Sequence, residues 1–107
     1  MNRGEVWWVD FDPAIGGEIK KQRLAVIISN NASNLHLNRL QVVPLTSNVA
    51  RIYPSEAFVE LNGQPRKTLG DQLTTASKLR LKSRIGELSA GDMVRVESAI
   101  RVQLGLS

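Results

Sequence analysis

The sequence predicts an α+β protein that is mainly β: a small curled sheet or barrel of five to seven short strands closed by a C-terminal amphipathic helix. Before Ser89, short runs rich in β-branched and aromatic residues recur between turn-forming residues. After Ser89, the apolar residues follow a helical period instead. The 107 residues are enough for one hydrophobic core and too few for two ordinary domains, so residues 1–107 are predicted to form a single domain.

The first strand is predicted at Glu5–Phe11, a run rich in aromatic and β-branched residues. Side chains alternate along a strand, so Trp7 and Trp8 should point to opposite faces, one into the core and the other toward the surface. Pro13 lies just beyond this strand, and residues 14–22 have the glycine-rich, basic composition of an exposed loop. Loops of this kind often carry function.

Two further strands are predicted in the middle of the chain. Residues 24–29 form a continuous apolar run, short enough for a strand that is buried on both faces. Residues 40–46 form the next strand. Because Pro44 has no N–H group, we expect it to lie at a sheet edge, a bulge or a strand end.

A hairpin and a two-sided strand follow. The pair Asn62-Gly63 tolerates positive φ and predicts a hairpin between a strand at 57–61 and a strand that begins near Lys67. Residues 79–85 alternate in character and predict an extended segment with one apolar and one basic side. Its apolar members are Leu79, Leu81 and Ile85, and its basic members are Arg80, Lys82 and Arg84.

The C-terminal helix is predicted from its apolar face and its first turn. Ser89, with Asp92 three residues later, resembles an N-cap followed by an acidic first turn. Residues on one helical face are apolar, which allows this face to cover the sheet. They are Met93, Val96, Ile100 and Leu104.

The composition favours a polyanionic partner. The 14 Lys and Arg residues outnumber the 10 Asp and Glu residues and give a net charge of +4. The absence of cysteine excludes disulfides, thiolate zinc sites and a cysteine nucleophile. No run of about 18 apolar residues occurs, so we expect a cytoplasmic protein without a membrane span.

Two candidate chemistries find weak support. His36 is the only histidine, so one subunit cannot build a two-histidine acid and base pair, and this residue is predicted at the surface. Asp10 and Asp12 together offer oxygen ligands to Mg²⁺, but paired acids are common at strand ends.

A phosphate pocket is the better candidate. Arg23 stands where a basic loop enters a buried strand, which gives its planar guanidinium a rigid base. Thr46 and Ser47 end another strand with two hydroxyls. If neighbouring strands bring these residues together, the pocket suits a phosphate that becomes pentavalent during transfer. The other basic residues either follow nucleic-acid phosphates or form an ordinary solvated face: Lys20, Lys21, Lys78, Arg80, Lys82 and Arg84.

Four stretches resemble the MazF/PemK family of toxin endoribonucleases in order and spacing. They are RGEVWWVDFDP at 3–13, RLAVIISN at 23–30, VVPLTSN at 42–48 and GELS at 86–89. The resemblance implies a homodimer of SH3-like barrels that cleaves single-stranded RNA, usually mRNA, within a short recognition sequence. It also implies a metal-free reaction without a cofactor, in which the ribose 2′-hydroxyl attacks the adjacent phosphate and leaves a 2′,3′-cyclic phosphate and a 5′-hydroxyl. A further implied partner is an antitoxin whose acidic tail covers the active site.

The resemblance assigns roles to particular residues. Arg23 matches the family's catalytic arginine, and Thr46 matches the threonine that holds the scissile phosphate. Ser47 is expected to assist by proximity, and the loop lysines Lys20 and Lys21 to bind RNA. The remaining expected RNA-binding residues, which orient groups or read bases, are Glu18, Asp71 and Gln72.

The chain also departs from the family pattern. The Arg-Pro that commonly starts the second strand is Arg23-Leu24 here, and the arginine that often follows Gln-Ile is Thr74. Some members place a histidine before the loop glutamate, where this chain has Gly17, so a histidine mechanism is disfavoured.

Two other functions use the same kind of fold. A CcdB-like protein would inhibit DNA gyrase without catalysis, and an SH3-like binding module would hold RNA without cutting it. Fold cannot separate these functions. Arg23, Thr46 and Ser47 favour the nuclease, because a gyrase inhibitor has no need of a phosphate pocket.

Overall fold

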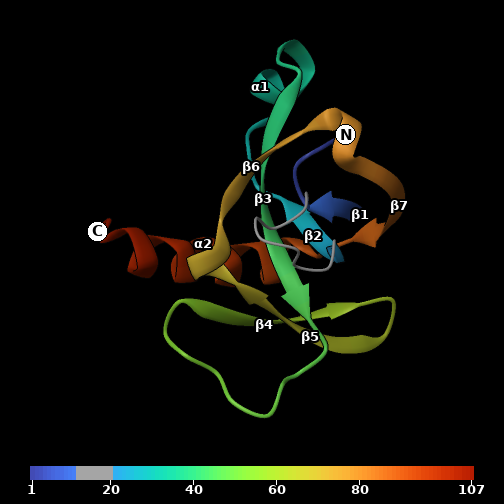
Figure 1. Ribbon diagram of the computed structural model, residues 1–107. Coiled ribbons are helices and arrows are strands. Elements are labelled where there is room, and N and C mark those ends of the chain that lie inside the picture. Colours follow the sequence, from blue (N-terminus) through green and yellow to red (C-terminus); the bar gives the residue numbers. More distant parts are fainter. Residues whose placement is uncertain (12–20) are drawn as a thin grey trace, which may run out of the picture.

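The computed structural model describes residues 1–11 and 21–107, with only the backbone of Lys21, and shows a mainly β protein with a C-terminal helix (Figure 1). The strands are β1 (Glu5–Phe11), β2 (Lys21–Ile27), β3 (Arg39–Thr46), β4 (Glu56–Leu61), β5 (Gln64–Leu69), β6 (Thr74–Ser77) and β7 (Leu81–Glu87). The helices are α1 (Asn31–His36) and α2 (Ala90–Leu104), with 3₁₀ turns η1 (Gly70–Gln72) and η2 (Lys78–Arg80).

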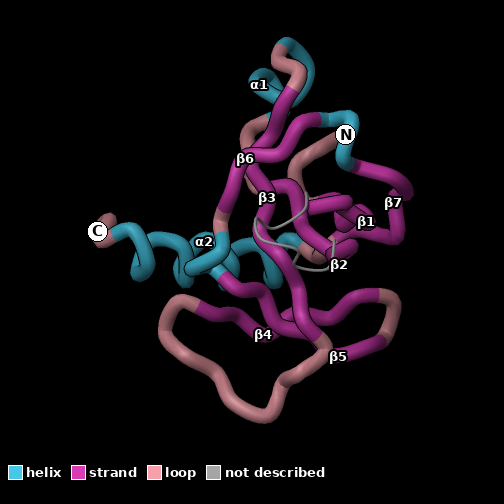
Figure 2. Tube along the Cα trace, in the orientation of Figure 1, coloured by secondary structure: helices cyan, strands magenta, loops and turns pink. Residues whose placement is uncertain are grey.

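All strand pairs in the described part of the chain are antiparallel, and the sheet runs in the order β4-β5-β3-β2-β1-β7, with β6 also paired to β3. The seven described strands confirm the predicted small β architecture, although the sheet is open rather than closed by a ladder between β4 and β7. Figure 2 shows β3 shared between the upper strands and the lower β4–β5 hairpin.

Pro44 was expected at a sheet edge, a bulge or a strand end, and it lies at neither an outer edge of the sheet nor a strand end. Pro44 lies inside the central strand β3, opposite Ala25 of β2, and is buried. On its other side, β3 pairs with β6 through residues 39–42 and with β5 through residues 45–46. Pro44 therefore lies where β3 changes partners, and a residue without an N–H group is tolerated there.

Two apolar clusters cover opposite faces of the central strands. Leu24 and Val26 belong to the cluster beneath α2, whereas Ala25 and Ile27 belong to the other cluster. This alternation confirms that the apolar run of β2 is buried on both faces. Trp7 packs against the second cluster, while Trp8 is 38% exposed, so the predicted division of the two tryptophans is confirmed.

Helix α2 begins as the sequence predicts. The Ser89 Oγ accepts a hydrogen bond from the Asp92 backbone N–H at 3.1 Å. Met93 and Val96 are buried and pack against the sheet, and Ile100 is partly buried. Leu104, which was expected on the same face, is exposed because the helix extends beyond the sheet at this end (Figure 1).

Three local features differ from the sequence prediction. Helix α1 lies between the second and third predicted strands, where the sequence analysis predicts no helix. Leu79 lies in η2 with 85% of its surface exposed, so the predicted apolar side of the basic segment begins only at Leu81. Strand β5 starts at Gln64 rather than Lys67, because Asn62 and Gly63 form a tight two-residue turn with φ of 51° and 79°.

Candidate functional site

Strands β2 and β3 bring Arg23 and Thr46 together. Ala25 pairs with Pro44 in this ladder, and the same register continued by two residues places Arg23 opposite Thr46. Arg23 is half-buried near the start of β2, and Thr46 is half-buried at the end of β3. The pocket that the sequence suggested therefore forms at the place where these two strands meet.

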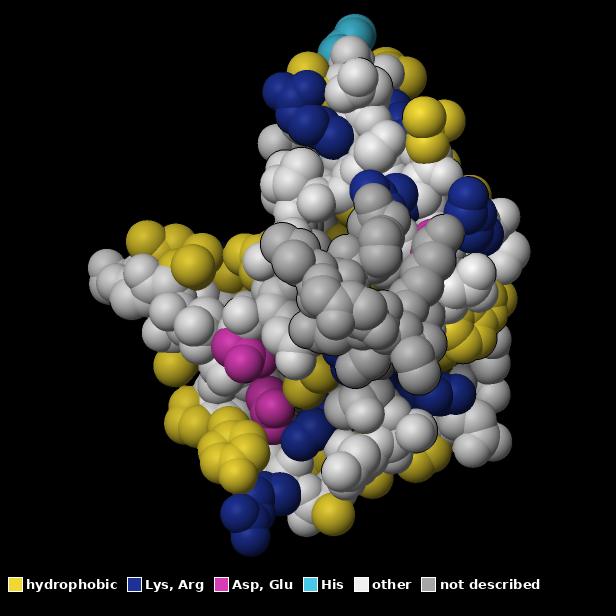
Figure 3. All heavy atoms as spheres, in the orientation of Figure 1, with side chains coloured by type: hydrophobic (Ala, Val, Ile, Leu, Met, Phe, Trp, Pro, Cys, Tyr) yellow, Lys and Arg dark blue, Asp and Glu magenta, His cyan; other side chains and the backbone are white. Residues whose placement is uncertain are grey.

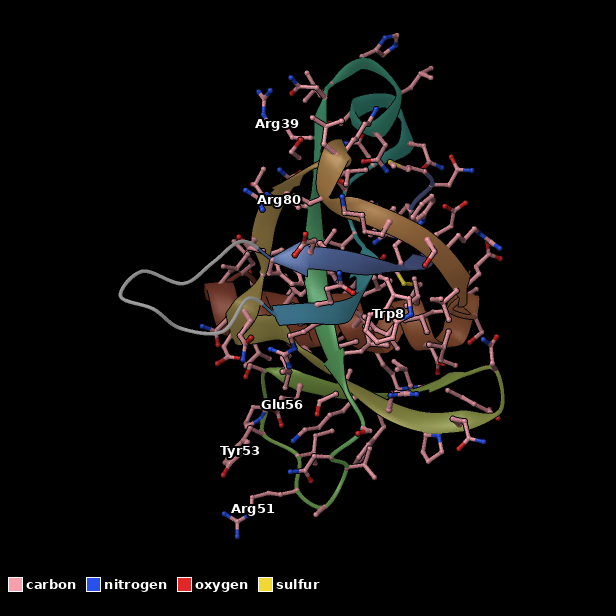
Figure 4. The ribbon with its side chains drawn as sticks, turned by 45° about the vertical axis from the view of Figure 1, so that its right-hand side comes forward. Trp8, Arg39, Arg51, Tyr53, Glu56 and Arg80 are labelled. Atoms are coloured by element: carbon pink, nitrogen blue, oxygen red, sulfur yellow. The ribbon has the colours of Figure 1, made fainter. Side chains whose placement is uncertain are left out.

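An open cavity of about 220 Å³ contains these residues. Arg23, Thr46 and Ser47 therefore line one cavity, as the sequence analysis suggested. Figure 4 places Trp8 at the centre of this region, between strand β1 and the β4–β5 hairpin. The complete lining is Trp8, Gln22, Arg23, Leu24, Leu45, Thr46, Ser47 and Arg66.

Arg23 is held from outside the cavity by Gln72. The Arg23 Nη1 donates a hydrogen bond of 2.9 Å to the Gln72 Oε1, which comes from the turn η1. Gln72, one of the expected RNA-binding residues, therefore lies beside Arg23. Asp71, the neighbouring candidate, is exposed and does not line the cavity.

The two hydroxyl residues lie where β3 passes into the following loop. The Thr46 Oγ1 accepts a hydrogen bond of 3.2 Å from the Asn48 N–H, so it holds the first turn of this loop. Ser47 is exposed beside it. A hydroxyl that accepts one hydrogen bond retains its own proton to donate to an anion.

Arg66 is a site residue that the sequence analysis missed. It follows from pairing alone: β5 lies beside β3 with Lys67 opposite Thr46, so the preceding residue, Arg66, reaches the same cavity. The only signal in the sequence is the hairpin turn, which sets the register of β5 but does not say which strand lies beside it.

The cavity has an excess of positive charge. Arg23 and Arg66 line it, and no Asp or Glu is among the described lining residues. The Arg66 Nε is buried, and within the described residues it has no hydrogen-bond partner. Two guanidinium groups beside two hydroxyls make a site that is suited to an anion with several oxygens, such as a phosphodiester.

Several candidate residues lie elsewhere. Glu18, Lys20 and the Asp12 of the possible metal pair lie outside the described residues, as does the side chain of Lys21. His36 is exposed at the end of α1, as predicted. Among the described residues, no three acidic, histidine or cysteine side chains gather as metal ligands, and no helix is long and apolar enough to cross a membrane.

The basic segment before α2 lies on η2 and β7, and its cations make contacts with the protein. Arg80 donates to the Asp10 carbonyl at 3.2 Å, and Lys82 donates to the Leu79 carbonyl at 3.1 Å. Arg84 lies 3.5 Å from a carboxylate oxygen of Glu5. Figure 3 shows Lys and Arg side chains spread over one face, with Asp and Glu visible mainly between α2 and β4.

Comparison with known proteins connects this geometry to one family. Residues 2–104 match the family described as "PemK-like, MazF-like toxin of type II toxin-antitoxin system". Over 115 aligned residues, the chain is 36% identical to Endoribonuclease MazF9 of Mycobacterium tuberculosis, and the match covers 99% of this chain and 98% of that protein.

Solved structures share the fold over the whole chain. An endoribonuclease in complex with its cognate antitoxin, from a mycobacterial species, is 26% identical with a TM-score of 0.82, covering 100% of this chain and 97% of that chain. A MazE-MazF structure from Deinococcus radiodurans is 27% identical with a TM-score of 0.79, covering 100% of this chain and 98% of that chain. MazF9 and the mycobacterial structure are both described as endoribonucleases, so the comparisons do not favour the gyrase-inhibitor alternative.

Proposed function

Because the chain belongs to the PemK-like, MazF-like family of toxins of type II toxin-antitoxin systems, we propose that it is a toxin endoribonuclease that cuts single-stranded RNA, such as mRNA, at a short recognition sequence. The observation that carries the proposal is the cavity in which two arginines and two hydroxyls meet without a neighbouring acid among the described lining residues. The scissile phosphate binds there, between Arg23 and Thr46.

The reaction is an internal transfer at phosphorus. The ribose 2′-oxygen forms a bond to the adjacent phosphorus and loses its proton, the bond from phosphorus to the 5′-oxygen breaks, and that oxygen gains a proton. The products are a 2′,3′-cyclic phosphate and a 5′-hydroxyl. The negative charge on the phosphoryl oxygens rises during attack, which is the change that fixed cationic donors stabilise best.

Arg23 supplies charge to the transition state. A guanidinium stays protonated in proteins at neutral pH, so Arg23 is a permanent cation and a poor proton acceptor. Its hydrogen bond to Gln72 holds the planar group in one orientation before the substrate arrives. Thr46 and Ser47 donate hydroxyl protons to the phosphoryl oxygens, and this set of groups performs the transfer without a metal or a cofactor.

The partners follow from the same site. An acidic antitoxin competes with RNA for the cavity, because a flexible chain of carboxylates matches the same cations. The structures described as an antitoxin complex and as MazE-MazF support a partner of this kind. The whole chain acts as one domain in a cytoplasmic homodimer.

Incubation of the protein with a long single-stranded RNA in excess EDTA tests the proposal. We expect cuts at one short motif, with 2′,3′-cyclic phosphate and 5′-hydroxyl ends, and at least a hundredfold slower cleavage by Arg23→Ala, about the effect of removing one charged donor from a transition state. Arg101→Ala, which removes an exposed arginine of α2, is the matched control and should cleave normally. Intact RNA together with stalled DNA gyrase would instead establish the inhibitor function.

A further inference from the structure

We propose that Trp8 and Arg66 form a nucleotide subsite beside the scissile phosphate, in which a base stacks on the Trp8 indole and the adjoining phosphate of the same strand binds Arg66. This inference rests on the proposed function, since it assigns the flanking nucleotide of an RNA already held at Arg23. Neither residue is assigned a step of the phosphoryl transfer described above, although Arg66 adds to the positive charge of the cavity.

Trp8 is an aromatic surface beside the phosphate pocket. It lines the same cavity as Arg23 and Thr46 and keeps 38% of its surface exposed. Strand β1 holds it in place through pairing with Leu24 on one side and Ser83 on the other. An exposed indole on a rigid strand is a stacking platform for any base, because every base has a π face.

The Arg66 guanidinium has a nitrogen that no described residue satisfies. Its Nε is buried and makes no hydrogen bond with the described residues, whereas the neighbouring Lys67 is paired with Glu56 at 2.9 Å. A half-buried guanidinium loses hydration, and one whose Nε has no partner among the described residues is available to an external anion. The second phosphate of a bound RNA supplies that anion.

The two residues fit one nucleotide step. Trp8 comes from β1 and Arg66 from β5, so the two residues line the cavity from two different strands. Figure 4 shows Trp8 between β1 and the β4–β5 hairpin. An RNA strand alternates base and phosphate along its length. A strand whose scissile phosphate occupies Arg23 and Thr46 therefore presents its next base and its next phosphate to the remaining walls of the same cavity.

Salt-dependent binding separates the two roles. The probe is a single-stranded RNA that carries the mapped cut motif with a 2′-deoxyribose at the scissile position, so that it binds but cannot be cut. The logarithm of the affinity falls linearly with the logarithm of the salt concentration, and each lost phosphate contact makes this slope shallower by about 0.7 for a single strand. We expect Arg66→Gln to make this slope shallower by about 0.7. Arg101→Gln, which replaces an exposed arginine on α2, is the matched control and should leave the slope unchanged.

Trp8→Leu should weaken binding without changing that slope. Loss of one stacked base corresponds to at least about a fivefold rise in Kd. The chain has two tryptophans, so Trp7→Phe leaves Trp8 as the only tryptophan, and RNA should quench its fluorescence. In Trp8→Phe, the remaining Trp7, which packs against the core and donates to Glu5, should show little quenching.

An abasic substitution identifies the stacked base. At one position flanking the cut, removal of the base should weaken binding of the unmodified protein by the same factor as Trp8→Leu, and should have no further effect on that variant. Independent losses at every flanking position, or an unchanged salt slope in Arg66→Gln, would overturn the subsite. If the protein cuts no RNA, the proposed function fails, and the same titrations with an uncut mixed-sequence RNA still test the subsite separately.

Discussion

Lys67 is a buried lysine on the strand beside the candidate site, with only 7% of its surface exposed. Its Nζ lies 2.9 Å from the Glu56 Oε1 and also donates to the Arg51 carbonyl. Glu56 in turn accepts a hydrogen bond of 3.0 Å from the Tyr53 N–H. Figure 4 shows Arg51, Tyr53 and Glu56 along the loop that follows Thr46 and Ser47. The buried pair thus ties this loop to the sheet.

The environment of Glu56 sets how this pair responds to pH. Burial raises the pKa of the carboxyl, but hydrogen bonds from Lys67 and the Tyr53 backbone, with the charge of Lys67, outweigh burial and hold the pKa below its ordinary value. The ionised carboxylate therefore stabilises the folded state fully above that ordinary value, and this contribution is lost as the pH falls through the lowered pKa.

We predict that Glu56→Gln lowers the free energy of unfolding by on the order of 3 kcal/mol at neutral pH, because it leaves the Lys67 charge buried without a counter-charge. The double variant Glu56→Gln/Lys67→Met should recover most of this loss, since it removes both charges. Urea unfolding from pH 7 to pH 3 checks both effects. Equal stability of the single and double variants would show that the pair has no part in holding the loop.

At the scale of elements, the turn η1 depends on a close approach between two segments. The Gly70 N–H donates to the Ser55 carbonyl at 3.0 Å. A Cβ at residue 70 would lie 2.3 Å from the same carbonyl oxygen, so this backbone contact is possible only for glycine. Two residues later, Gln72 accepts the hydrogen bond from Arg23. The position of η1 therefore sets the position of the Gln72 side chain beside Arg23.

We predict that Gly70→Ala displaces η1 and slows RNA cleavage by about tenfold to a hundredfold, since a shift of about 1 Å in a positioning group costs rate on this scale. The matched control is Gly91→Ala in α2, where the nearest atom to the added Cβ would be the Ser89 Oγ at 3.9 Å. This control should cleave normally and gain about 0.5–1 kcal/mol of stability. Cleavage rates and urea midpoints of both variants provide the measurement.

At the scale of the whole molecule, β2 and β3 join the two apolar clusters. Neighbouring residues of these strands contribute to opposite faces, as Val26 and Ile27 of β2 and Val42 and Val43 of β3 do. Neither cluster can lose its packing completely while β2 and β3 remain paired, because both strands contribute side chains to both clusters. This shared backbone supports cooperative unfolding of the fold as one unit.

We predict a single unfolding transition that the two tryptophans report alike. In Trp8→Phe, fluorescence follows Trp7 in the second cluster, and in Trp7→Phe it follows Trp8 beside the first. In each variant, the fluorescence midpoint in urea should coincide with the midpoint from circular dichroism. Separate midpoints within one variant would show that the clusters unfold independently.

Local patterns in the sequence were enough for much of the fold. Three predictions are confirmed: the Ser89 cap, the Asn62-Gly63 turn and the apolar run of β2. The sequence could predict them because each leaves its pattern within a few neighbouring residues. Arg23, Thr46 and Ser47 were also identified before the structure, because each stands at the end of a predictable strand.

Contacts between distant segments decided the rest. Pro44 is accepted inside a central strand only because β3 changes partners there, and Leu79 is exposed only because η2 interrupts the alternation before β7. Arg66 enters the site because β5 pairs with β3, a choice between strands that the sequence of β5 does not contain. By itself, the sequence determined most of the strands, the C-terminal helix and the residue types available to the candidate site, since these depend on local spacing and residue type. The tertiary structure decided which cations and aromatic groups share the cavity, because that depends on which strands lie side by side.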